Sequence, residues 1–130
     1  MEWRSGRARC TVAFTVHVGA HFALECRTEG DAVRLCVRGD LDLATSAALH
    51  QALEDQRRAG RAVLMDLSAV GFMDASGLRV LLEAQDAARR HGQSLAADAH
   101  VPPAVSRVLE VTGTGSLLDW HGVMAAAHVH

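Results

Sequence analysis

Lysine is absent from this 130-residue chain, and all 13 of its basic residues are arginines. The arginines are scattered along the sequence, and 15 acidic residues bring the formal net charge to -2. Proteins that bind nucleic acid usually concentrate positive charge on one face or along one helix. The charge pattern therefore predicts no nucleic-acid partner. Hydrophobic residues make up 49% of the chain, an ordinary proportion for one globular domain.

Cysteine is scarce as well, with three residues at positions 10, 26 and 36. No pair has the CxxC spacing of a zinc or redox site, and an odd number argues against a disulfide framework. Disulfide-poor small domains are typical of reducing compartments. We therefore expect no cysteine-based metal site and a cytoplasmic location.

Long apolar runs are also missing, and no stretch approaches the roughly 18 residues of a membrane-spanning helix. We therefore expect no membrane insertion. Residues 1–20 combine arginines with an apolar stretch, as a signal peptide does. However, Val12, Phe14 and Val16 alternate with smaller or polar residues, and this period of two is typical of a β-strand. We expect residues 1–20 to be an N-terminal extension that adds an edge strand or is loosely held.

A β-hairpin is predicted at the start of the domain body. Residues 22–28 and 32–39 alternate apolar with polar side chains, and the TEGD sequence between them has turn chemistry. We expect this turn to place Leu24 opposite Leu35. In that register the two cysteines of the hairpin lie on opposite faces of the sheet and cannot form a disulfide.

The segment after the hairpin has the pattern of an amphipathic helix. Thr45 or Ser46 can cap its start, and Gly60 can end it. Leu49 and Leu53 are four residues apart, so they share the face that we expect to be buried.

Strand and helix patterns then alternate to the end of the domain. The continuous apolar run at 61–68 is typical of a strand buried on both faces. A helix begins near the DASG sequence, a weak strand follows it, and a third helix is expected at 102–113. Together these segments predict an α/β domain over residues 21–120. Its mixed β-sheet has an antiparallel first hairpin, then parallel β-α-β units, and is flanked by helices. The C-terminal tail, residues 121–130, has no clear partner.

Two polar loops follow strands of the predicted parallel sheet, GDLDL at 39–43 and DASG at 74–77. Functional loops in open α/β sheets gather beyond the carboxyl ends of the strands. Strands joined by a crossover helix are often neighbours, so these two loops should lie close together. The resulting patch is acidic and carries one hydroxyl: Asp40, Asp42, Asp74 and Ser76.

Ser76 has three possible roles at its strand-to-helix junction. Its hydroxyl can cap the helix, as the Asp74 carboxylate also can. A nucleophilic serine needs an adjacent base, but no GxSxG elbow is present and no histidine is tied to this loop. A phosphorylated serine would place negative charge at a helix N-terminus, where free amides and the helix dipole favour it. The aspartates come without a phosphate-binding P-loop, so we expect no metal.

Apolar residues beside the two loops divide between packing and contact. We expect Phe72 to belong to the core and Met73 to be either core or contact. Leu41 and Leu43 favour packing over a role as binding hot spots.

Four separated motifs together resemble one family. The sequences VRGDLDLATSAAL, VLMDLSAVGFMDASGLRVLL, RRHGQSL and PPAVSRVLEVTG occur in this order over about residues 21 to 120. They are similar to the STAS domain in its small, stand-alone bacterial form, the anti-sigma factor antagonist or anti-anti-sigma factor. The resemblance implies a non-enzymatic protein of stress signalling and transcription regulation. In the unphosphorylated form it would bind an anti-sigma factor that is also a serine kinase, and so release a sigma factor.

The resemblance also implies roles for individual residues. Ser76 matches the serine that the partner kinase phosphorylates with its own ATP, and a serine phosphatase would reverse the reaction. Ala75 stands where the family often has another serine, which leaves one acceptor in this loop. The chain itself needs no cofactor. The implied partner-binding residues are Asp40, Leu41, Asp42, Asp74, Ala75, Ser76 and Gly77.

Two alternatives stay open at this point. A STAS module can also work in another stress-signalling assembly or in a transporter complex, and its loop would look similar. A small serine hydrolase using Ser76 is the alternative from a different class, and it needs a histidine within hydrogen-bond reach of the Ser76 oxygen.

Overall fold

Six strands form one mixed sheet in the computed structural model, which describes residues 10–122 and the side chains of residues 15–28 and 30–122. The strands lie in chain order, antiparallel from the first to the third and parallel from the third to the sixth. This arrangement confirms the predicted α/β fold. The elements are β1 (Cys10–His17), β2 (Phe22–Glu29), β3 (Ala32–Leu41), α1 (Leu43–Arg58), β4 (Ala62–Met73), α2 (Ala75–Arg90), β5 (Leu95–Asp98), α3 (Pro103–Thr112), the 3-10 helix η1 (Gly115–Leu117) and β6 (Trp120–His121).

The hairpin of β2 and β3 differs from the predicted register. Leu24 lies opposite Val37, not opposite Leu35, because β2 runs on to Glu29 and the turn consists only of Gly30 and Asp31. The predicted register is therefore wrong by two residues. A shift of two residues keeps every side chain on its own face of the sheet, so the expected inner and outer faces are unchanged.

The two cysteines of the hairpin are free and lie on opposite faces, as expected. Cys26 is buried against the core, whereas Cys36 is only half-buried on the other face. Burial raises the pKa of both thiols above the ordinary cysteine value. Both groups therefore stay protonated at neutral pH and are poor nucleophiles.

Both ends of the described chain join the sheet. β1 pairs antiparallel with β2, so the edge strand expected within the N-terminal extension is present. At the opposite edge His121 pairs with Asp98, so the tail that was expected to lack a partner begins with one paired residue. Residues 1–9 and 123–130, which are the first part of the predicted extension and most of the predicted tail, lie outside the described residues.

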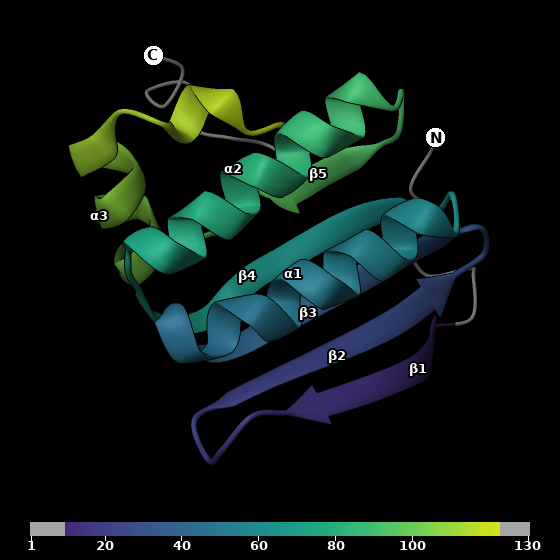
Figure 1. Ribbon diagram of the computed structural model, residues 1–130, viewed down its shortest axis with the longest axis horizontal. Coiled ribbons are helices and arrows are strands. Elements are labelled where there is room, and N and C mark those ends of the chain that lie inside the picture. The colour runs from purple at the N-terminus through teal and green to yellow at the C-terminus, as the bar shows by residue number, and fades with distance from the viewer. Residues whose placement is uncertain (1–9, 123–130) are drawn as a thin grey trace.

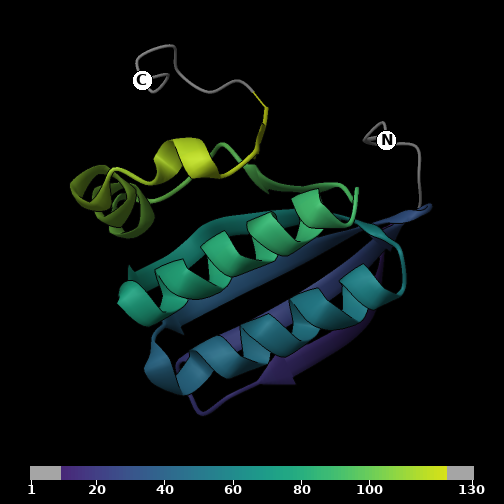
Figure 2. The same ribbon diagram turned by 45° about the horizontal axis from the view of Figure 1, so that its top comes forward.

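The core lies between one face of the sheet and two helices. Figures 1 and 2 show α1 and α2 side by side across this face, with β1 and β2 extending beyond them. Leu49 of α1 and Leu81 of α2 are fully buried and belong to the same cluster as Leu35 and Met65 of the sheet. α3 packs against β4 instead, near the end of the sheet where α2 begins (Figure 1). No helix within residues 10–122 is long and apolar enough to cross a membrane.

β4 is the longest strand and carries the chain to the predicted loop at 74–77. It continues past the predicted end at residue 68 to Met73. Its register against β3 shifts twice, between Cys36 and Arg38 and between Gly39 and Asp40. Each shift inserts an extra residue in β4, and such bulges increase the local twist of a strand. The strand therefore ends beside Leu41, level with the end of β3.

Candidate functional site

The two polar loops meet at the carboxyl ends of β3 and β4, as the sequence predicts. The backbone N–H of Asp74 donates to the carbonyl oxygen of Leu41 over 3.2 Å. Gly77 packs directly on the same residue, since a Cβ atom at Gly77 would lie 2.7 Å from Leu41 Cγ. This close approach requires glycine at position 77. We call residues 39–43 and 74–77 together the paired loops.

Asp42, in the first of the paired loops, caps the N-terminus of α1. Its carboxylate accepts the backbone N–H of Thr45 at 3.1 Å, and the Asp42 N–H donates to Thr45 Oγ1 at 2.9 Å. This reciprocal pair is a capping box. The prediction that Thr45 or Ser46 is the cap is wrong, because both residues already lie inside the helix and are buried.

Asp74, in the second of the paired loops, caps the N-terminus of α2. Its Oδ1 accepts the backbone N–H groups of Ser76 at 2.8 Å and Gly77 at 3.2 Å. Of the two cap candidates, the carboxylate of Asp74 holds the position and the Ser76 hydroxyl does not. Two of the amides that we expected to be free for a phosphate are thus already paired with a carboxylate.

Ser76 consequently has a hydroxyl without a structural task. It occupies the second position of α2, its side chain is half-buried, and its Oγ makes no hydrogen bond within the part of the chain that the structure describes. No described histidine is therefore within hydrogen-bond distance of this oxygen. The geometry gives the hydrolase alternative no base to activate the serine.

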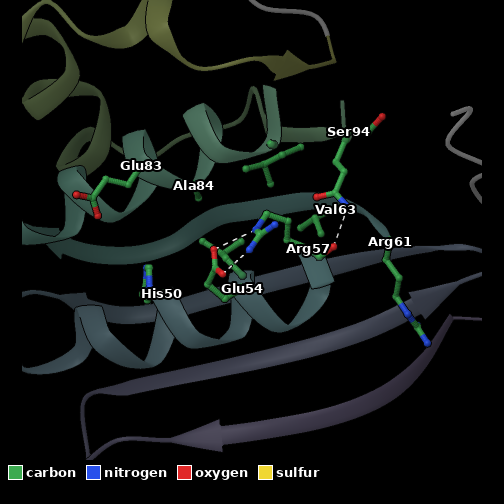
Figure 3. A pocket seen from close by; sticks show the side chains of 12 residues that line it. His50, Glu54, Arg57, Arg61, Val63, Glu83, Ala84 and Ser94 are labelled. Atoms are coloured by element: carbon green, nitrogen blue, oxygen red, sulfur yellow. Dashed lines mark hydrogen bonds and ion pairs between the residues drawn. The ribbon is translucent and has the colours of Figure 1, made fainter. Parts of the chain in front are cut away.

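The cleft between α1 and α2 is separate from the paired loops (Figure 3). Glu54 and Arg57 form an ion pair of 2.7 Å along it, and the hydrogen bond from Arg57 lowers the pKa of the Glu54 carboxyl. Arg61 and Ser94 lie at one end of the cleft, and His50 lies on α1 near the other. Ser76 lines neither this cleft nor the polar hollow bordered by Gly30, Gly60 and Gly92.

Two apolar side chains near the paired loops are exposed against expectation. Phe72 is 49% exposed, so its assignment to the core is wrong, whereas Met73 is buried and belongs to the core. Phe72 pairs with Asp40, and the strand alternation turns both away from the face that Met73 and Leu41 share. Leu43 is the first residue of α1 and is 76% exposed, so the packing role expected for it is also wrong.

The predicted partner-binding residues divide by accessibility. Ala75 is exposed, and Asp40, Asp42, Asp74 and Ser76 are half-buried. Leu41 and Gly77 are buried, because they pack against each other beneath the loops. Partner binding by these two residues stays a prediction. The packing role also predicted for Leu41 is confirmed.

Sequence reasoning missed Phe72 as a candidate contact, and for Leu43 it favoured packing over contact. The alternation with Met73 is the signal that could have identified Phe72, once the strand was known to extend that far. Among the side chains that the structure describes, residues 15–28 and 30–122, no three His, Cys, Asp or Glu lie together in a way that could hold a metal ion.

Comparison with known proteins agrees with this fold. The family model described as Mlab, STAS domain, matches residues 24–119. An anti-sigma factor antagonist from Mycobacterium paratuberculosis is 22% identical, with a TM-score of 0.65 over 86% of this chain and 95% of that one.

The anti-sigma factor antagonist SpoIIAA in its unphosphorylated form is 16% identical, with a TM-score of 0.63 over 76% of this chain and 88% of that one. The Bacillus cell fate determinant SpoIIAA in its phosphorylated form is 17% identical, with a TM-score of 0.58 over 78% and 91%. At such identities these similarities show a shared fold. Because the family model spans most of the sequence, the chain belongs to the STAS domain family.

Proposed function

We propose that this protein is an anti-sigma factor antagonist whose binding is controlled by phosphorylation of Ser76. The observation that supports this most is the Ser76 hydroxyl, which has no hydrogen-bond partner among the described residues and lies where the paired loops meet. In the unphosphorylated form the protein binds an anti-sigma factor with serine kinase activity, and so frees a sigma factor for transcription. Solved structures of SpoIIAA in unphosphorylated and phosphorylated forms share this fold, which supports the proposal.

Phosphorylation of Ser76 would change the charge of the paired loops more than their structure. A phosphate adds about -1.5 to -2 charges at neutral pH. The dipole of α2 favours that charge, but the Asp74 carboxylate already holds the amides of Ser76 and Gly77. The phosphate is therefore directed outward by repulsion from Asp74. A partner docked on the paired loops then meets new bulk and negative charge.

The unmodified surface offers a partner both apolar and polar contacts. Leu43 and Ala75 are exposed beside the two helix N-termini, and Asp40 lies beside exposed Phe72. Well-packed apolar anchors surrounded by polar groups are typical of protein interfaces. A phosphate that costs about 2.7 kcal/mol at such an interface weakens binding about a hundredfold. The mechanism requires a partner kinase that uses ATP and a serine phosphatase that removes the phosphate. All of these proteins would act in the cytoplasm. The mechanism needs no cofactor and no enzymatic activity of this chain.

The experiment that tests this proposal is phosphorylation in vitro. The protein is incubated with ATP and the anti-sigma factor kinase of the same organism, and the product is analysed by intact mass and peptide mapping. We expect a single phosphate on Ser76 and none in Ser76→Ala. Incorporation at another residue, or no incorporation, would contradict the proposal.

Ser68 provides the matched control for this experiment. It is exposed like a typical substrate serine, but its hydroxyl is bonded to Asp66 Oδ1 at 2.6 Å, on β4 before the paired loops. Ser68→Ala should therefore leave the incorporation unchanged. A loss of phosphate in Ser68→Ala would show that the kinase does not recognise the paired loops.

A further inference from the structure

β1 forms one edge of the sheet, and within residues 10–122 no segment pairs with its outer side. It precedes the residues that match the family model. Its sequence, CTVAFTVH, has no Asp, Glu, Lys, Arg, Gly or Pro. Natural edge strands usually carry charges or prolines that prevent pairing with another chain, and β1 has neither.

The outward hydrogen-bonding groups of β1 can be assigned from one backbone hydrogen bond at the turn between β1 and β2. The N–H of Val18 donates to the carbonyl of Phe22 at 3.0 Å, so Val18 faces β2. Backbone groups alternate in direction along an antiparallel strand. Val16, which lies opposite Leu24, therefore also faces β2, and Thr15 and His17 direct their N–H and C=O groups away from the sheet.

We propose that two copies of this protein associate through their β1 strands, paired antiparallel about a two-fold axis. Thr15 of one copy then lies opposite the partner subunit's His17, and each such pair exchanges two backbone hydrogen bonds. The axis passes through Val16, which lies opposite the partner subunit's Val16. The two sheets become one continuous sheet.

The side chains on this edge favour a second copy as the occupant. Val16 is 36% exposed on the face shared with Leu24, and the same residue of the other copy would cover it. Self-pairing puts no like charges opposite each other, because β1 has no Asp, Glu, Lys or Arg. Apolar pairs directly across a strand pair stabilise a sheet.

The same geometry limits the assembly to a dimer. The other edge of the sheet is β6, which has only two residues and gives little backbone for pairing. An interface that repeats the same patch on both copies is closed and does not extend into fibres. Only β2 lies between β1 and β3, whose end forms part of the paired loops. Ser76 follows β4, one strand further from the dimer axis, so both copies keep Ser76 accessible. The inference does not depend on phosphorylation of Ser76.

Sedimentation velocity of the full chain tests the proposal. Between about 1 µM and about 1 mM, a range that covers weak association, the mass should rise from 13.9 kDa towards twice that value. Val16→Glu places like charges at the axis and should remain a monomer, as should Val16→Lys. An equimolar mixture of these two variants should dimerise again, because opposite charges then meet at the axis.

Two further variants keep the test decisive. His17→Pro removes an outward N–H without removing a bond to β2, so it should also be monomeric while its thermal unfolding stays cooperative. Ala47→Glu adds the same charge at an exposed position of α1 and should still dimerise. A wild-type protein that stays monomeric throughout, a Val16→Glu variant that still dimerises, or species larger than a dimer would each overturn the proposal.

Discussion

At the scale of single residues, Asp74 and Ser76 divide two tasks between positions two residues apart. The Asp74 carboxylate satisfies the amides of Ser76 and Gly77, which would otherwise lack partners at the helix start. The Ser76 hydroxyl is left without a bond in the described structure and is available for chemistry. A serine that served as the cap would lose its structural bond on phosphorylation. The aspartate cap therefore lets the hydroxyl be modified without removing the start of α2.

This division predicts effects of different size for two alanine variants on the free energy of unfolding. Asp74→Ala should lower the free energy of unfolding by about 1 kcal/mol, because two helix amides lose their acceptor. Ser76→Ala should change it by no more than about 0.5 kcal/mol, since no hydrogen bond is lost. Urea unfolding followed by circular dichroism measures both. A Ser76→Ala variant as unstable as Asp74→Ala would show that the hydroxyl has a structural role.

At the scale of the elements, the contact of Gly77 with Leu41 fixes the start of α2 against the end of β3. Leu41 is fully buried, and its side chain and carbonyl oxygen both lie within 2.7 Å of where a Gly77 Cβ would be. The Asp74 N–H binds the same carbonyl oxygen at 3.2 Å. The paired loops are thus held at a fixed distance by packing and by one hydrogen bond.

Glycine variants measure how much this contact contributes. Gly77→Ala should destabilise the protein by about 1–3 kcal/mol, because the new methyl group overlaps Leu41. Gly71→Ala in β4 is the matched control, since nothing lies within 4 Å of its Cβ position. That control should change the free energy of unfolding by less than about 0.5 kcal/mol. Equal effects in thermal or urea unfolding would contradict the close approach of the two elements.

The sequence predicts elements better than their exact registers and ends. Period-two and helical patterns identify the strands and helices, and turn residues place the hairpin. The hairpin register was wrong by two residues because either a two-residue or a four-residue turn preserves the same inner face. Phe72 was misassigned because the bulges of β4 carry the strand five residues beyond its apolar run, and bulges leave no periodic signal.

The candidate site was predictable in position but not in its bonding. The order of strands brings the paired loops together, and this follows from the βαβ pattern. Which residue caps each helix depends on where the helix begins, and Ser, Thr and Asp are similarly good caps. The sequence therefore left open whether Asp74 or Ser76 caps α2, and only the structure assigns the carboxylate to that position.

At the scale of the whole molecule, the sheet separates the surfaces that the two proposals use. The paired loops lie where β3 and β4 end, and β1 lies two strands away at the sheet edge. A dimer formed through β1 would thus present two Ser76 hydroxyls to two partners. Charge added at Ser76 acts on partner binding, and charge added at Val16 acts on self-association. The two proposals can therefore fail independently.

The central claim is that phosphate on Ser76 weakens partner binding, and calorimetric titration tests it most directly. The anti-sigma factor kinase is titrated, without ATP, with the unmodified protein and with protein carrying one phosphate on Ser76. We expect the phosphorylated form to bind at least about a hundredfold more weakly, a loss of about 2.7 kcal/mol. Ser76→Ala should bind like the unmodified protein and should keep its affinity when ATP is added. Equal affinities of the phosphorylated and unmodified forms would contradict the account.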